Sequence, residues 1–437
     1  MRGGGLMLRW LDLLYAVPMS GWLACRWVRG RAARRLALSR ALGRVGGVQP
    51  DAGQPVWMHG VSVGEVLALV PLVARFRTRF PGVPVVVSAS TSTGLATAHD
   101  RFADLPVFAF PLDWSWAVRR AFDTVNPRLI VLAESELWPH FLAEAKRRGV
   151  PVVVVNARLS PRSYRRYAML GRAARWLLAQ VDHFAVQSPV YAEQLRRLGV
   201  PPARLSVTGS IKYDGVCADR DNPKTSQLRW LFGLRATDPV IVCGSTQAPE
   251  EALALRAFTQ LQRQCPDLRM IVVPRHPERF DAVARLLAES GLPFARRSQL
   301  RQPLDRCPPL VLVDTVGELA AVWGLACIAF VGGSLDGKRG GQNLIEPAAY
   351  GAAVVVGPHT WNFRDVVTRF AQADALRVVH SGDELTATLS RLLADPIERL
   401  RIAEAARQLV LSGQGATERT LAVLQAFLPE AMPRLVA

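Results

Sequence analysis

The chain has 437 residues, more than a single ordinary hydrophobic core accommodates, so its length suits two domains. Its composition, 50% hydrophobic and 21% charged, excludes an intrinsically disordered protein. The formal net charge of +18 indicates an anionic partner, and lipid is favoured over nucleic acid because the chain carries no zinc-finger spacing, RNA-recognition signature or basic–aromatic interleaving.

The N-terminal segment combines an apolar run with a large positive charge. Residues 1–50 hold nine arginines and one acidic residue, Asp12, so they carry +8 of the net charge. The run Leu13–Cys25 is shorter than the roughly 20 residues that a bilayer-spanning helix needs, and six arginines lie from Arg29 to Arg44. We therefore predict that residues 1–45 form a membrane anchor with a basic helix on anionic lipid. Spanning, surface attachment and burial as an ordinary helix stay open, whereas the arginines disfavour a cleaved signal peptide.

From residue 55 onward, β-branched apolar runs alternate with helical patterns, which is typical of parallel strands covered on both faces. The first half predicts helices such as 66–80 and 137–148, and strands over 56–59, 85–88, 107–110, 129–133, 152–156 and 183–187. After a polar stretch that contains glycine and proline, strands are predicted over 240–244, 268–273, 310–313, 328–331 and 353–356.

This rhythm predicts an α/β protein of the GT-B kind, with two doubly wound Rossmann-like domains that face a central cleft. The domains would span residues 46–213 and 229–437, joined by a linker over 214–228. Ligands of such sheets bind just beyond the carboxyl ends of the strands. Polar clusters fall there repeatedly, at 59–65, 90–94, 134–136, 244–246, 274–277 and 332–334.

The turn after the first predicted strand reads Gly60-Val61-Ser62-Val63-Gly64-Glu65 and allows three interpretations. The spacing of Gly60, Ser62 and Gly64 matches the nucleophile elbow of serine hydrolases. Ser62 and Glu65 also match a capping box, in which both side chains only satisfy backbone donors at a helix start. In the third interpretation Glu65 is a general base that projects into the cleft.

Three more charged residues of the first half attract attention. Glu134 and Glu136 follow a strand, and because they are two residues apart in extended chain they point in opposite directions, so one of them would face the cleft. Alternatively both are acids at a helix N-terminus, where the dipole favours them. Lys212 lies just before the linker, where it would reach an anionic group in the cleft or be solvated.

In the second half, Arg275 and His276 stand between two prolines after a strand, where Arg275 can bind phosphate or carboxylate. The stretch 332–347 is rich in glycine, so its backbone N–H groups can approach a phosphate, and a helix is predicted to start near Asn343. Glu346 would take the two hydroxyls of a ribose.

Signals for a metal site are weak. The six cysteines include no C-x-x-C pair, and no histidines cluster at metal spacing. One D-x-D pair, Asp219 and Asp221, lies in the polar linker, and we interpret it as solvated.

The following motifs occur in this order: HGVSVGE, ESELWP, NARLS, SIKYD, GSTQAPEE, PRHPERF, VGELA, FVGGS, GGQNLIEPAAYG and GPHTWNF. Together they resemble the 3-deoxy-D-manno-octulosonic acid (Kdo) transferases of Gram-negative bacteria, over about residues 6 to 365. SIKYD departs mildly from the family pattern, as does Gln342 where a histidine is common, and both leave the charged residues in place.

The resemblance implies an inverting, metal-independent GT-B glycosyltransferase without a cofactor. Its donor would be CMP-Kdo and its acceptor a phosphorylated lipid A precursor, at the cytoplasmic face of the bacterial inner membrane. Glu65 would be the base, and Glu134 (or, less favoured, Glu136) and Lys212 would assist the transition state. The CMP-binding residues would be Arg275, His276, Val316, Gly317, Glu318, Asn343, Leu344, Ile345 and Glu346.

Three alternatives remain at the level of the sequence. One is a GT-B enzyme that uses another nucleotide sugar, such as a UDP-sugar. The second is a serine hydrolase built on Ser62, which would leave the glycine-rich stretch unexplained. The third is a membrane-associated binding protein without catalytic activity.

Overall fold

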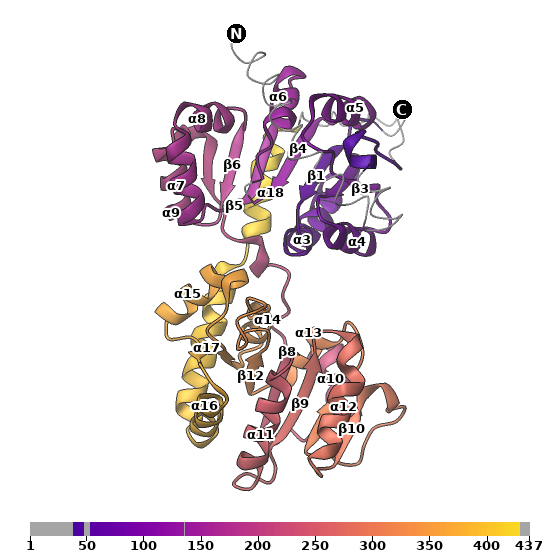
Figure 1. Ribbon diagram of the computed structural model, residues 1–437, viewed down its shortest axis with the longest axis vertical. Helices are drawn as coiled ribbons and strands as arrows, with labels where there is room; N and C mark the ends of the chain where they lie inside the picture. Colours follow the sequence, from indigo (N-terminus) through magenta and orange to yellow (C-terminus); the bar gives the residue numbers. More distant parts are fainter. Residues whose placement is uncertain (1–37, 48–52, 135, 429–437) are drawn as a thin grey trace, which may run out of the picture. The chain divides into compact units, whose positions relative to one another are not determined.

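The computed structural model describes residues 38–47, 53–134 and 136–428. They form two compact units: residues up to Gly215 together with those from Gly413 onward make unit 1, and Val216–Ser412 make unit 2 (Figure 1). Most of the predicted membrane anchor, residues 1–37, lies outside the described ranges, so it stays a prediction. Within those ranges, no helix combines the length and apolarity needed to cross a bilayer.

Unit 1 is built on a seven-stranded, all-parallel sheet with the order β3-β2-β1-β4-β5-β6-β7. Its strands are β1 (Val56–Gly60), β2 (Val85–Ala89), β3 (Val107–Ala109), β4 (Leu129–Ala133), β5 (Val152–Ala157), β6 (His183–Val186) and β7 (Leu205–Val207). Its helices are α3 (Val63–Arg79), α4 (Ser92–Arg101), α5 (Ser115–Val125), α6 (Pro139–Arg147), α7 (Pro161–Leu170), α8 (Arg172–Ala179), α9 (Pro189–Arg197) and α18 (Ala416–Gln425), with short turns η2 (Pro202–Arg204) and η3 (Ile211–Tyr213).

Both faces of this sheet are covered, which explains the unbroken apolar runs of its strands. Along β1, Trp57 packs into a cluster with α5, α6, α8 and α9, whereas its neighbours Val56 and Met58 pack on the other face with α3, α4 and α18. The period of two along a strand thus sends adjacent side chains into two separate cores.

Unit 2 repeats the plan with the parallel order β10-β11-β9-β8-β12-β13-β14. Its strands are β8 (Val240–Thr246), β9 (Arg269–Pro274), β10 (Phe294–Arg296), β11 (Leu310–Leu312), β12 (Ile328–Val331), β13 (Ala353–Val356) and β14 (Arg377–Val378). Its helices are α10 (Pro223–Leu231), α11 (Glu250–Gln262), α12 (Phe280–Glu289), α13 (Leu319–Val322), α14 (Ile345–Ala349), α15 (Arg364–Gln372), α16 (Gly382–Ala394) and α17 (Pro396–Gly413), with turns η4 (Pro277–Arg279), η5 (Arg297–Gln299), η6 (Trp323–Leu325) and η7 (Trp361–Phe363).

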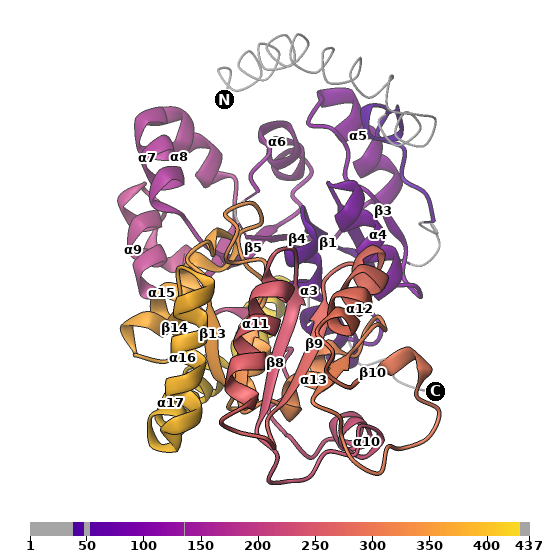
Figure 2. The ribbon, with the colours of Figure 1, turned by 60° about the horizontal axis from the view of Figure 1, so that its bottom comes forward.

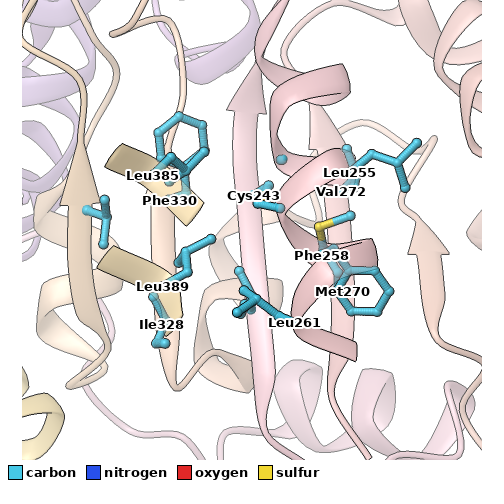
Figure 3. Packing of buried hydrophobic residues seen from close by; sticks show 14 of the residues in the cluster. Cys243, Leu255, Phe258, Leu261, Met270, Val272, Ile328, Phe330, Leu385 and Leu389 are labelled. Atoms are coloured by element: carbon cyan, nitrogen blue, oxygen red, sulfur yellow. The ribbon is translucent and has the colours of Figure 1, made fainter. Parts of the chain in front are cut away.

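One large core holds α11 and α16 against this second sheet. Phe258 and Leu261 of α11 and Leu385 and Leu389 of α16 face the strand residues Cys243, Met270 and Phe330 (Figure 3). In Figure 2, α11 lies over β8 and α12 lies beside β9. The loops that follow β8 and β9 therefore start from strands that are buried in this core.

The predicted strands are confirmed, each within about two residues of its observed bounds. The strands that sequence reasoning missed are β7, β10 and β14, which are two or three residues long. All three are edge strands, and most of their side chains are only partly buried. An edge strand needs no long apolar run, so it leaves little periodic signal.

The predicted linker over 214–228 is wrong in its second half, because α10 begins at Pro223. Asn222 caps this helix by accepting the Thr225 N–H at 3.1 Å, and Thr225 is buried. The two acids of the D-x-D pair are exposed, as expected, while Arg220 between them donates to the carbonyls of Ala326, Tyr350 and Gly351.

The predicted C-terminal domain, 229–437, is also wrong at its end, because α18 belongs to unit 1. Leu421 and Leu424 of α18 complete the core beneath α3. The carboxylate of Asp214 accepts the backbone N–H groups of Gly415, at 2.7 Å, and Thr417, so it fixes the start of α18. Helical periodicity alone cannot tell which core a terminal helix completes.

Part of the predicted basic helix is described, and one of its arginines does not face solvent. Arg40 is buried, with Nε donating to the Phe110 carbonyl at 2.8 Å and Nη1 to the Ser90 carbonyl at 2.9 Å. This arginine therefore ties the N-terminal segment to loops at the carboxyl edge of the unit 1 sheet and is not available to lipid.

The return of α18 to unit 1 predicts a large stability effect for a residue far from the rest of that unit in sequence. Leu421→Ala should lower the free energy of unfolding by about 2–5 kcal/mol, because it leaves a cavity in a closed core. Leu400→Ala on the exposed side of α17 is the matched control, with an expected change within about 0.5 kcal/mol. Equal urea-unfolding midpoints for the two variants would contradict the assignment of α18 to the unit 1 core.

Candidate active site

The predicted catalytic residues of unit 1 come from neighbouring strands. Glu65 lies in the first turn of α3, directly after β1, and Glu134 follows β4, which pairs with β1. Because the carboxyl ends of parallel strands meet at one edge of a sheet, these side chains lie close enough for the charges of Glu134 and Glu136 to act on Glu65.

The Glu65 carboxylate is held by its own turn. Its Oε2 accepts the Val61 backbone N–H at 2.7 Å and its Oε1 accepts the Ser62 hydroxyl at 3.1 Å. Burial raises the pKa of Glu65 to about 7, the charges of Glu134 and Glu136 act in the same direction, and the two hydrogen bonds oppose them. A carboxylate with a pKa near neutrality suits a general base, since near neutral pH it is partly ionised and more basic than an ordinary carboxylate.

Ser62 is the N-cap residue of α3, but its hydroxyl donates to Glu65 and accepts no cap hydrogen bond. The predicted capping box is therefore not formed, because Glu65 accepts the N–H of Val61 and not that of the N-cap residue Ser62. The side-chain partner of Ser62 in the described part of the chain is a carboxylate and not the histidine that a hydrolase nucleophile needs. In this turn Glu65 is the ionisable side chain, and the hydroxyl of Ser62 holds it through a hydrogen bond.

Glu134 lies between two cations. Lys212 Nζ donates to Oε1 at 2.9 Å and Arg158 Nε donates to Oε2 at 2.8 Å. Burial alone would raise the pKa of Glu134, but Lys212 and Arg158 outweigh it and hold the pKa below its ordinary value. Glu134 also has a φ of +60°, a strained backbone conformation for a residue other than glycine.

Glu136, the less favoured alternative, has the opposite electrostatic setting. Burial raises its pKa, and the charge of Glu134 raises it further. The structure thus brings Lys212 to Glu134 and not to Glu136. The two acids also differ in the protonation that their surroundings favour.

Arg158 is a site residue that sequence reasoning missed, although it lies in the NARLS motif. It follows β5, which pairs with β4, so the rule that polar residues gather at the carboxyl ends of strands would have found it. Asn156, two residues earlier, accepts the Ile211 N–H at 3.3 Å through Oδ1. Since Ile211 precedes Lys212, this bond helps to place the lysine.

A buried polar network underlies the turn that carries Glu65. His59 Nδ1 lies 2.9 Å from the Ser88 hydroxyl, which also accepts the Trp57 indole N–H at 2.8 Å. The His59 ring stacks on Phe110, and burial lowers the pKa of His59 to about 3. A neutral histidine in this position is structural, and it fixes the end of β1.

In unit 2, Arg275 and His276 follow β9 and their side chains are exposed. The backbone N–H of Arg275 donates to the Thr246 carbonyl at 3.0 Å, which ties this turn to the end of β8. Both residues therefore present their side chains from a fixed backbone at the carboxyl edge of the sheet.

The backbone N–H groups at the start of the glycine-rich stretch already have a partner within unit 2. The N–H groups of Gly333, Ser334 and Leu335 donate to the buried carboxylate of Glu250 at 2.7, 2.9 and 3.1 Å. Burial raises the pKa of Glu250, and the hydrogen bonds from these N–H groups oppose that shift. The Glu250 carboxyl therefore uses N–H groups that the sequence offered to a phosphate. Further along, Arg339 pairs with Asp336.

The predicted helix near Asn343 is α14, which begins at Ile345. Asn343 accepts the Ile345 N–H at 3.0 Å and donates its amide to Glu346 Oε1 at 3.0 Å. Burial raises the pKa of Glu346. The side chains of Leu344 and Ile345 are buried in the unit, so only their backbone can meet a ligand.

The last predicted segment follows β11. Val316 is 79% exposed, and Gly317 has a φ of +92°, which favours glycine. Glu318 accepts two hydrogen bonds from Arg297, at 2.8 and 3.2 Å, and one from the Thr315 hydroxyl. The side chain of Glu318 is thereby fixed beside an exposed turn.

Comparisons with known proteins show which families the chain is similar to. Residues 31–215 match the family described as 3-deoxy-D-manno-octulosonic-acid transferase (kdotransferase), and residues 337–425 match a family described as glycosyl transferase-like. The chain is 36% identical over 435 residues to the 3-deoxy-D-manno-octulosonic acid transferase of Bordetella pertussis, covering 95% of this chain and 99% of that protein. The Haemophilus influenzae protein of the same name is 33% identical over 397 residues, covering 90% and 92%.

Solved structures agree on the fold. UDP-GlcNAc 2-epimerase from Neisseria meningitidis matches with a TM-score of 0.58 at 11% identity, covering 85% of this chain and all of the other. A glycosyltransferase from Rickettsia africae matches with a TM-score of 0.53 at 11% identity, covering 87% of this chain and all of the other. The two α/β units therefore resemble those of GT-B glycosyltransferases.

The relatives in sequence exclude both the serine hydrolase and the binding protein without activity. They are transferases over nearly the whole chain, and Ser62 is bonded to a carboxylate. The chain therefore belongs to the family of 3-deoxy-D-manno-octulosonic acid (Kdo) transferases, and it is a glycosyltransferase that transfers Kdo.

Proposed function

We propose that this protein transfers Kdo from CMP-Kdo to a phosphorylated lipid A precursor with inversion at the sugar, as a step of lipopolysaccharide biosynthesis. The observation that carries the proposal is the pair of contrasting carboxylates in unit 1. Glu65 has a pKa of about 7, whereas Glu134 is held ionised by Lys212 and Arg158. One acid is suited to take up a proton and the other to remain charged.

In this mechanism Glu65 accepts the proton of the acceptor hydroxyl as the new bond to the sugar forms. The bond from the sugar to the CMP phosphate breaks on the opposite face, and CMP leaves with the electron pair. The negative charge of Glu134 raises the basicity of Glu65. Lys212 holds Glu134 in place and adds positive charge near the acidic sugar.

Unit 2 supplies the donor site in this proposal. Arg275 and His276 contact the CMP phosphate, because they are exposed polar side chains on a fixed turn. The segments 316–318 and 343–346 line the nucleoside. We propose that the reaction needs no metal ion, with cationic side chains meeting the charge of the phosphate.

The acceptor and the membrane are expected to meet a basic surface of unit 1. Between Leu159 and Val181 the chain has five arginines and no acidic residue, and all five are exposed on α7 and α8. No residue of α7 is fully buried, and Met169 at its end is 79% exposed. Together with the predicted anchor over residues 1–45, this surface supports attachment to anionic lipid at the cytoplasmic face of the inner membrane.

The role of Glu65 as the general base is tested by substituting Glu65 and Ser62 separately. Glu65→Gln keeps the shape of the side chain but removes the base, so transfer from CMP-Kdo should fall roughly 10²–10⁴-fold while CMP affinity stays the same. Ser62→Ala should leave transfer largely intact. For the wild-type protein, log kcat/KM should drop with a slope of one as the pH falls below about 7, because Glu65 then becomes protonated.

The residual activity of Glu65→Gln should lack this acid limb. A variant that transfers Kdo at nearly the wild-type rate would remove Glu65 from the mechanism. A folded but inactive Ser62→Ala protein would assign the chemistry to the hydroxyl.

The donor site is tested by calorimetric titration with nucleotides. Arg275→Ala should weaken CMP binding by about 1.5–3 kcal/mol, since it removes a charge-assisted contact to phosphate. The wild-type protein should prefer CMP over UMP and UDP. Wild-type affinity in the variant would place Arg275 outside the site, and a preference for UDP would favour a different nucleotide sugar.

The basic surface is tested by sedimentation with anionic vesicles at low salt. Replacing Arg162, Arg165 and Arg166 with glutamine should lower the partition coefficient by roughly 10²-fold, because each arginine near an anionic surface contributes about 1 kcal/mol. The control removes the same charge from exposed arginines of unit 2, at positions 235, 263 and 285. If both triple variants lose binding equally, net charge and not the α7 surface explains the attachment.

A further inference from the structure

Two adjacent acids begin α11 in unit 2, and both are buried. Glu250 and Glu251 are each 1% exposed, although a buried carboxylate is costly unless hydrogen bonds or an opposite charge compensate it. Each is compensated by a different segment of the unit. Those two segments hold most of the residues that the proposed function assigns to the donor.

Glu250 is satisfied entirely by backbone N–H groups. Its Oε2 accepts from Gln247 at 3.0 Å and Gly333 at 2.7 Å, and its Oε1 accepts from Ser334 at 2.9 Å and Leu335 at 3.1 Å. A Cβ atom at Gly332 would lie 2.8 Å from Glu250 Oε2 and 2.6 Å from the Cα atom of Thr246. Glycine at position 332 therefore allows the close approach of both Glu250 and the end of β8.

Further backbone hydrogen bonds connect the residues that Glu250 holds to the rest of the glycine-rich stretch. The carbonyl of Gly333 accepts the Gly341 N–H at 2.7 Å, and the carbonyl of Ser334 accepts the His359 N–H at 3.0 Å. Gly341 is two residues before Asn343. The path of the chain into the segment 343–346 thus starts from a loop that Glu250 holds.

Glu251 holds the other segment. Arg279 donates to its two oxygens from Nε at 3.3 Å and from Nη2 at 3.1 Å. The Arg279 backbone N–H donates to the His276 carbonyl at 3.0 Å. This short turn carries Arg275 and His276, so the ion pair fixes the base from which both side chains project.

We propose that Glu250 and Glu251 are positioning residues for the donor, each acting through the segment that it holds. Glu250 shapes the glycine-rich loop from inside, and Glu251 orients the turn of Arg275 and His276. Because Glu250 uses the N–H groups of Gly333, Ser334 and Leu335, these three groups do not bind the phosphate of the donor. This inference rests on the proposed function, in which unit 2 binds the CMP part of the donor.

The test compares Glu250→Gln and Glu251→Gln with wild-type protein in steady-state transfer and in titration with CMP. Each variant should raise the KM for CMP-Kdo and the Kd for CMP about tenfold, with kcat and the KM for the lipid acceptor nearly unchanged. A raised KM for CMP-Kdo with an unchanged kcat indicates lost ground-state binding of that substrate. A general loss of folded protein would instead lower the apparent kcat and leave both KM values unchanged. Adding Arg279→Gln to Glu251→Gln should cause little further loss, because the two residues act as one pair.

Glu384→Gln is the matched control. Glu384 is likewise an acid in the first turn of a unit 2 helix, α16, and accepts a backbone N–H from His380 at 2.8 Å. Its substitution should leave the KM for CMP-Kdo unchanged.

If Glu250→Gln and Glu251→Gln lower the melting temperature but bind CMP like the Glu384 variant, they are structural only and the inference is wrong. If Glu250→Gln does not fold, Glu251→Gln decides alone, since its partner Arg279 is partly exposed and can be hydrated. If the wild-type protein binds no CMP, the proposed donor is wrong and this inference fails with it.

Discussion

The double ion pair of Glu134 with Lys212 and Arg158 is the interaction on which the electrostatics of unit 1 depends. It joins the ends of β4 and β5 to the short turn before the unit boundary. It also keeps one carboxylate ionised in a buried setting, and that charge raises the pKa of Glu65 and Glu136. Lys212 and Arg158 thus affect the pKa of Glu65 through the charge of Glu134.

The two units use buried carboxylates in opposite ways. In unit 1 the surroundings shift the pKa of Glu65 upward and that of Glu134 downward. In unit 2 the Glu250 carboxyl accepts hydrogen bonds from backbone N–H groups of the glycine-rich loop, as a bound anion would. A glycine-rich loop after a strand therefore need not be a phosphate site, since a neighbouring helix can supply the anion that organises it.

Sequence reasoning predicted the central strands and the strand ends where polar residues gather, because buried parallel strands leave long apolar runs and the sheet brings their ends together. Through the family motifs, it also predicted that Glu65, Glu134 and Lys212 act in one site. It missed Arg158 and the buried roles of Arg40 and Glu250, whose partners lie 24, 50 to 70 and 83 to 85 residues away. Contacts over such separations leave no periodic pattern.

The return of α18 to unit 1 makes unit 2 an insertion within unit 1, so the chain passes between the units twice, after Gly215 and before Gly413. On the ribosome, domains generally fold from the N-terminus as they emerge. Here the core beneath α3 lacks Leu421 and Leu424 until almost the whole chain has been synthesised. Unit 2 is therefore complete first, and unit 1 keeps an open apolar face beneath α3 until α18 has been synthesised.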